Sequence, residues 1–292
     1  MVDRPSGSGG PDSGSMLADG PLSTPLMKNV PPPAPGPGLW LRKVLYLVDQ
    51  MGIVSLLTVR TARAFFTRPF EARAIVYQLE SVGVKSVGIA SVTAVFIGMV
   101  MAVQFAISLQ KFGAMEYTGR VLGLSFAREL APTLTAVIVG GRVGAGMAAE
   151  VGSMAVTEQV DAIRALGADP VKKLVLPRVA ASVIAMPILA MLALVLGFSG
   201  GMAVTSSQFD IPPEFFLRTA LNSVAMSDYL SGICKTPFFG AIIALVGCHF
   251  GLITTGGTEG VGKATTRTVV VISIAILIAD FFLTKALFWV FG

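Results

Sequence analysis

The sequence predicts an all-α integral membrane protein with five transmembrane helices. Hydrophobic residues make up 53% of the 292 residues and charged residues only 13%, whereas soluble domains carry roughly 25% charged residues. The mean hydropathy of +0.75 and the 32 glycines fit helices packed closely in lipid, where small residues let backbones approach. Lys and Arg gather between the apolar stretches, so the net charge of +5 indicates membrane topology and gives no support for nucleic-acid binding.

Two segments precede the first predicted span. Residues 1–38 are rich in Gly, Pro, Ser and Asp and cannot bury enough apolar surface to offset the entropy cost of ordering, so we expect a disordered tail. Residues 39–78 predict an interfacial helical segment, because apolar residues between Trp40 and Phe70 alternate with Arg, Lys and Asp. A soluble amphipathic helix on a partner would show the same pattern. Residues 79–292 form the five-span membrane domain.

Five apolar stretches are long enough to cross the hydrocarbon core, which takes about 20 helical residues. They are Ser86–Gln110, Val121–Met154, Val179–Gln208, Thr236–Thr258 and Thr268–Phe291. Basic residues cluster before the first, after the second and after the fourth stretch, which predicts a cytoplasmic N-terminus and a periplasmic C-terminus. Between the third and fourth stretches, Pro212 and Pro213 should begin a short helix, because proline is tolerated in a first helical turn.

Charged residues inside the predicted spans are the strongest candidates for function. Arg128 and Glu129 lie in the outer part of the second span, where a charge is costly unless it is paired or faces a wet cavity. Glu129 is the foremost candidate, and two interpretations stay open: it lines a cavity, or it forms a structural clamp with Arg128 or Arg142. Asp280 and Lys285 raise the same question in the fifth span.

No pattern of catalytic residues is present. Residues 257–264 nearly match the phosphate-binding loop GxxxxGK[ST], but Ala264 occupies the position of the hydroxyl that holds magnesium, and a membrane span precedes the segment. Its glycines predict a tight turn between two spans. His249 is the only histidine, and neither GxSxG nor HExxH occurs. The sequence therefore predicts no catalytic residue, no metal site and no cofactor in this chain.

The segment between the second and third spans predicts a short cytoplasmic helix. Residues 153–167 combine charged and apolar side chains, with Thr157 as a plausible N-cap and Gly167 as a C-terminal stop. This helix either connects the two spans in water or docks on a cytoplasmic partner.

The most distinctive stretches are Val95–Val100, Arg128–Pro132, Gly141–Gly152, Val156–Ala162 and Ala264–Val270. They resemble the MlaE/YrbE permeases, the membrane subunits of ABC transporters that serve MCE-domain lipid-trafficking systems. The resemblance, which covers Leu79 to the C-terminus, implies a permease subunit that moves phospholipid between the bacterial inner membrane and the outer envelope. It also implies a homodimer, a cytoplasmic ABC ATPase dimer that binds ATP and Mg, and a hexamer of MCE-domain proteins on the outer side.

Two sites follow from the resemblance. A lipid cavity that opens outward between the two subunits would be lined by Met101, Gln104, Phe105, Leu109, Phe112 and Glu129. The helix over residues 157–166 would be a coupling helix in a groove of the ATPase, with contacts from Thr157, Glu158, Gln159, Asp161 and Arg164.

Two other classes of function fit the same residues. An ion- or proton-coupled secondary transporter would need no ATPase and would use a relay of Glu129, Arg142, Glu150, Asp280 and Lys285. A structural membrane anchor that recruits soluble partners would tolerate substitutions in the predicted cavity.

Overall fold

The computed structural model describes residues 39–65 and 72–291, and every regular element within these ranges is helical. Five helical units there are long and apolar enough to cross a membrane: Ala72–Gln110, Met115–Val156, Val171–Gln208, Met226–Leu252 and Gly257–Trp289. The predicted all-α membrane fold with five spans is confirmed. The predicted disordered tail, residues 1–38, lies outside the described residues.

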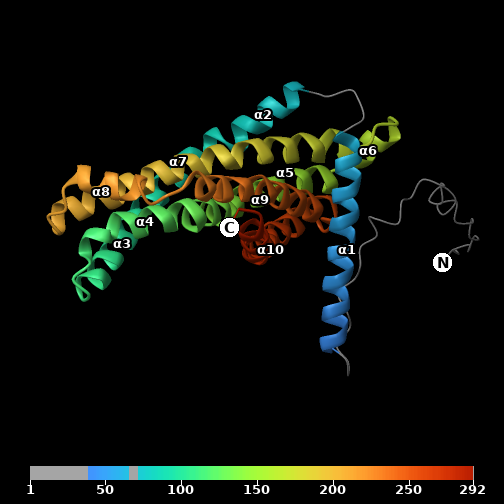
Figure 1. Cartoon of the computed structure of the whole chain (residues 1–292). Helices are drawn as coiled ribbons and strands as arrows, with labels where there is room; N and C mark the ends of the chain where they lie inside the picture. The colour runs from blue at the N-terminus through green and yellow to red at the C-terminus, as the bar shows by residue number, and fades with distance from the viewer. Residues whose placement is uncertain (1–38, 66–71, 292) are drawn as a thin grey trace, which may run out of the picture.

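Helix α1 (Leu39–Phe65) runs across the direction of the spans, beside one end of the bundle (Figure 1). Its residue Leu57 is buried in a cluster with Leu174 and Leu245. The interfacial position of this segment stays a prediction. The boundary expected between residues 78 and 79 falls inside the next helix, α2 (Ala72–Val82).

The first two spans are each built from more than one helix. In the first span, α2 is followed by the short 3₁₀ helix η2 (Val84–Ser86) and by α3 (Val87–Gln110). The second span consists of η3 (Met115–Tyr117), α4 (Thr118–Ser125), the π-helical η4 (Phe126–Leu134) and α5 (Thr135–Val156). Pro132 lies inside η4. Because proline has no N–H and its ring displaces the carbonyl one turn earlier, the widened π-helical stretch accommodates it.

The second half of the chain forms three more spans. In order, its elements are α6 (Gln159–Ala165), the π-helical η5 (Val171–Val175), α7 (Leu176–Gln208), α8 (Pro213–Leu221), α9 (Met226–Leu252) and α10 (Gly257–Phe291). Pro213 is the first residue of α8, which confirms the predicted short helix.

The predicted starts of four spans are wrong. The helical units of the first and third spans begin at Ala72 and Val171 and not at Ser86 and Val179. The helix of the fourth span begins at Met226 and not at Thr236, and that of the fifth begins at Gly257 and not at Thr268. Charged residues interrupt the apolar pattern in these first turns, although the backbone is already helical. The turn between α9 and α10 depends on Gly256 and Gly257, whose φ angles are 85° and 64°. The rest of the segment 257–264, predicted as a tight turn, is helical.

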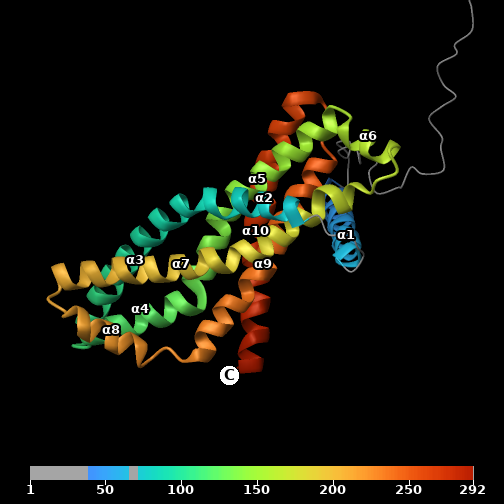
Figure 2. The same cartoon turned by 90° about the horizontal axis from the view of Figure 1, so that it is seen from above.

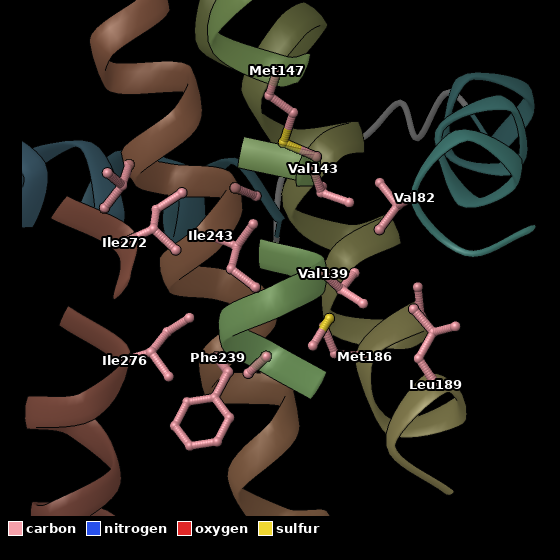
Figure 3. Close-up of a cluster of buried hydrophobic side chains, with 14 of the residues drawn as sticks. Val82, Val139, Val143, Met147, Met186, Leu189, Phe239, Ile243, Ile272 and Ile276 are labelled. Carbon is pink, nitrogen blue, oxygen red and sulfur yellow. The ribbon is translucent and has the colours of Figure 1, made fainter. Parts of the chain in front are cut away.

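The spans pack through small residues and one apolar core. Gly98 of α3 lies against Gly197 of α7, and a Cβ at position 98 would overlap the Gly197 backbone. Such close approach of backbones is what small residues permit in lipid. Figure 3 shows the largest buried cluster, in which α5 lies between α7 on one side and α9 and α10 on the other. Its members include Val139, Met186, Phe239, Ile243, Ile272 and Ile276.

The bundle has two unlike ends. At the end that we call the α6 end, α1 and α6 lie together (Figure 1). At the opposite end, the α8 end, the chain divides into two arms: α3, α4, α7 and α8 form one, and the C-terminal part of α10 forms the other. Figure 2 shows these arms pointing apart.

Candidate functional site

A lysine lies inside the bundle where three spans meet. The side chain of Lys235, on α9, is only 1% exposed. Its Nζ donates to both carboxylate oxygens of Glu129 at 2.8 Å and to Oδ1 of Asp280 at 3.2 Å. It also donates to the Thr284 hydroxyl at 2.6 Å. One buried ammonium therefore joins a carboxylate of η4 to a carboxylate of α10, and we call this group the Lys235 cluster.

The local sequence makes this contact possible. The carbonyl of Arg128, in π-helical η4, accepts a hydrogen bond from Lys235 Nζ at 3.2 Å. Gly232, one turn before Lys235, lets α9 approach η4, because a Cβ there would overlap the carbonyl of Ala127. A charged side chain inside a membrane domain is costly unless it is paired, as Lys235 is, or faces a water-filled cavity.

A second ion pair lies next to the Lys235 cluster. Arg128 Nε donates to Oδ1 of Asp228 at 2.7 Å, and Arg128 Nη2 lies 2.6 Å from the same oxygen. The other oxygen of Asp228 accepts the backbone N–H of Ala225 at 2.9 Å and so caps the start of α9. Of the two interpretations of Glu129, the clamp with Arg128 or Arg142 does not form: Arg128 pairs with Asp228, Arg142 binds Ser86, and Glu129 pairs with Lys235.

A cavity of about 110 Å³ opens beside these two ion pairs. It is lined by Arg128, Glu129, Ser227, Asp228, Ser231, Thr284, Leu287 and Phe288. The lining residues come from η4, α9 and α10, which are the elements that the Lys235 cluster joins.

The structure separates the six residues predicted for the lipid cavity. Glu129 belongs to the Lys235 cluster, whereas the other five lie on α3 or just beyond it. Met101 and Phe105 pack against a buried cluster that includes Leu122 and Phe216. Of the remaining three, Leu109 is half-buried and Gln104 and Phe112 are exposed. Within one chain, the α3 residues do not line the cavity that Glu129 lines.

The residues predicted to contact an ATPase lie together at the α6 end. Gln159, Asp161 and Arg164 are exposed on α6. Arg164 Nη1 donates to Oδ1 of Asp161 at 2.7 Å, which is a pair one helical turn apart.

The ends of α6 differ in part from the prediction. Thr157 is not its N-cap: the Thr157 hydroxyl donates to the carbonyl of Ser153 at 2.8 Å and so belongs to the end of α5. Glu158 precedes α6 in the left-handed conformation, with φ of 60°, and turns the chain between the two helices. Gly167 ends the segment with φ of 77°, as predicted.

The charged residues of the relay hypothesis fall into separate groups. Glu129 and Asp280 are joined by Lys235, but Arg142 and Glu150 lie on α5, nearer the α6 end. Arg142 Nη1 donates to the Ser86 hydroxyl at 2.8 Å, and Glu150 pairs with Arg178 at 2.9 Å.

The sequence pattern did not single out Lys235. It lies directly before Thr236, where the predicted fourth span begins. One signal could have found it, because Lys235 has uncharged residues on both sides from Tyr229 to His249. A lone ionisable residue in such a stretch is a candidate functional residue in a membrane protein.

Five apolar spans around an enclosed group of charges define a multi-pass α-helical membrane protein. The chain belongs to the MlaE permease family, since the family model described as Permease MlaE matches residues 75–286.

Three relatives support this assignment. A probable ABC transporter permease protein of Synechocystis sp. is 46% identical over 211 residues, which cover 72% of this chain and 80% of that protein. A probable ABC transporter permease protein of Rickettsia prowazekii is 36% identical over 247 residues, with 85% and 95% covered. The chloroplastic protein TRIGALACTOSYLDIACYLGLYCEROL 1 of Arabidopsis thaliana is 39% identical over 211 residues, with 72% and 60% covered.

The expected family is thus confirmed, and the chain is the permease of an ABC transporter. Such a permease is a transport subunit that works with an ATPase partner. This assignment weighs against both the secondary transporter and the structural anchor.

Proposed function

We propose that this permease moves phospholipid between the bacterial inner membrane and the outer envelope. It acts as a homodimer, and a cytoplasmic ATPase dimer binds ATP and Mg and supplies the energy. A hexamer of MCE-domain proteins on the periplasmic side exchanges lipid with it. Support comes from the permease family and from the Arabidopsis relative, which is named after a galactolipid.

The proposed orientation places the α6 end in the cytoplasm and the α8 end, with the C-terminus, in the periplasm. Arg164, Lys172, Lys173 and Arg178 follow the second span close to the α6 end, and such basic residues mark cytoplasmic segments.

The observation that supports transport most is the position of the Lys235 cluster between the two arms of the α8 end. Glu129 lies on η4, which directly follows α4 of the first arm, and Asp280 lies on α10, which forms the second arm. When ATP binding moves the arms, the distances from Lys235 to these carboxylates change, and π-helical η4 supplies the local freedom for that change. Movement of the arms would then change the position of Glu129 at the lipid site.

In the proposed dimer, lipid occupies a cavity between the two subunits. Apolar side chains of α3 hold the acyl chains, and Glu129 faces the headgroup region. The exposed and half-buried side chains of this face are Met101, Gln104, Phe105, Leu109 and Phe112. Phe112 is 83% exposed in the single chain, and in the proposed dimer a second subunit or lipid covers it.

The ATPase is proposed to dock on the coupling helix at the α6 end. Thr157, Glu158, Gln159, Asp161 and Arg164 are all exposed there. Only a short left-handed turn at Glu158 separates α6 from α5, and α5 directly follows η4. A displacement of α6 by the ATPase would therefore displace the end of α5 and, through this helix, η4.

Reconstitution of the complete complex tests the proposal. Proteoliposomes that contain the permease, its ATPase and its MCE-domain partner should move fluorescent phospholipid only with ATP. Glu129→Gln should slow this transfer about tenfold, since one charge-assisted bond is lost. Glu116→Gln, an exposed substitution at the same end, is the matched control. Transfer by the permease alone that stops when the proton gradient collapses would contradict the proposal.

A further inference from the structure

A second polar cavity lies away from the Lys235 cluster. It has a volume of about 280 Å³ and is formed between α2 and α5. Its lining combines four polar or charged side chains with an apolar wall: Gln78, Ser81, Arg142 and Glu150 with Val82, Val143, Gly146 and Met147. Figure 3 shows Val82 of α2 beside Val143 and Met147 of α5, at the apolar wall.

The cavity lies level with the beginning of the first span. Arg142 Nη1 donates to the Ser86 hydroxyl at 2.8 Å, and the charge-free helix α3 starts at the next residue, Val87. From there, the 24 residues of α3 rise about 36 Å at 1.5 Å per residue, enough to cross the hydrocarbon core. On the other side of Ser86, α2 carries Arg73 and Glu80. The cavity therefore sits at the boundary between hydrocarbon and headgroups in the leaflet at the α6 end.

The charged side chains around the cavity favour a ligand that carries both an anionic group and a hydrogen-bond donor. Arg178, whose side chain is 8% exposed, already pairs with one oxygen of Glu150 at 2.9 Å. Arg142 is exposed and its guanidinium has several further donors. Two cations and one carboxylate leave positive charge in excess, nearest to Arg142. The side chain of Glu150 is 53% exposed, so its carboxylate keeps the capacity to accept from a ligand.

We propose that this cavity binds the headgroup of a phospholipid from the leaflet at the α6 end. Arg142 binds the phosphate, Glu150 accepts from a headgroup ammonium, and Val82, Val143 and Met147 contact the glycerol and the first methylenes. The volume is near the lower end for ligand pockets, roughly 300 Å³, so the headgroup fits while the acyl chains remain in the bilayer. The site needs contact with phospholipid but does not depend on the proposed transport function.

Photo-labelling in lipid nanodiscs tests this site. The assembled permease is exposed to phosphatidylethanolamine with a photoactivatable headgroup, and the labelled peptides are identified by mass spectrometry. The expected label lies on residues 143–150. Arg142→Gln should lower the labelling about tenfold, since a charge-assisted phosphate contact is lost, while Arg73→Gln on the exposed face of α2 should leave it unchanged. Glu150→Gln should reduce the preference for this lipid over a photoactivatable phosphatidylglycerol.

Three outcomes would overturn the proposal. The first is equal labelling of the Arg142→Gln and Arg73→Gln proteins. The second is loss of labelling on addition of millimolar inorganic phosphate, which would make the site one for the free anion. The third is rapid disulfide formation between two Gly146→Cys chains without lipid labelling, which would show that a second copy covers the cavity. None of these readouts measures transport, so the site and the proposed function can fail independently.

Discussion

The Lys235 cluster and the Arg142 cavity both place charge inside the membrane domain, but they differ in what satisfies that charge. The donors of Lys235 are taken up by Glu129, Asp280, Thr284 and a backbone carbonyl, and the side chain is 1% exposed. Arg142 is exposed and donates to a serine hydroxyl at the edge of a cavity. The donors of Lys235 all meet protein acceptors, so this ammonium holds helices together, whereas Arg142 keeps donors that a ligand in the cavity can accept.

Replacing Lys235 should lower the stability of the protein more than any other substitution considered. Lys235→Met leaves two carboxylates without their buried cation, and removal of one partner from a buried ion pair costs about 3–5 kcal/mol. Arg142→Gln, at the open cavity, should change the free energy of unfolding by less than about 1 kcal/mol. Reversible unfolding of both proteins in mixed micelles measures the difference.

A compensating variant separates charge from packing in the Lys235 cluster. If the lost cation is the cause, Lys235→Met combined with Glu129→Gln and Asp280→Asn should regain much of the stability, because no unpaired charge is left. Equal stability of Lys235→Met and the wild-type protein would show that the cluster is not a structural tie.

Two glycine substitutions in α3 test helix packing, and we expect an effect of intermediate size on stability. Gly98→Ala places a methyl group against the Gly197 backbone, and such overpacking costs about 1–3 kcal/mol. Gly88→Ala is the matched exchange in the same helix, where a Cβ meets nothing within 4 Å, and it should be neutral or slightly stabilising. Thermal unfolding monitored by circular dichroism ranks the two variants.

The smallest effect on stability is expected on α6. The Arg164–Asp161 pair is exposed, and exposed ion pairs contribute roughly 0–1 kcal/mol. Arg164→Glu should therefore leave the fold intact, while it weakens association with the ATPase and lowers ATP turnover of the complex. Co-purification and turnover are the measurements, with Lys263→Glu, in another exposed pair of the α6 end, as the control. Unchanged association would remove α6 from the proposed coupling interface.

A feature of this protein could be predicted from the sequence where it depends on residues that are close together in the chain. The five spans, the short helix at Pro213 and the stop at Gly167 depend on neighbours in the chain, so the sequence predicts them. Predictions failed where a local pattern competed with packing. Thr157 has the residue type of an N-cap, yet α5 runs on to Val156 and uses the Thr157 hydroxyl for its own last turn.

A five-span α-helical membrane protein of the permease family can be predicted from the sequence alone, because it depends on hydrophobic length and on local motifs. Which charged side chains pair with one another depends on tertiary packing. Glu129, Lys235 and Asp280 come from three spans separated by 106 and 45 residues, and close packing at Gly232 brings them within hydrogen-bonding distance. Arg142 and Glu150 lie two helical turns apart on one helix, yet the cavity beside them exists only because α2, which packs on α7, lies next to α5.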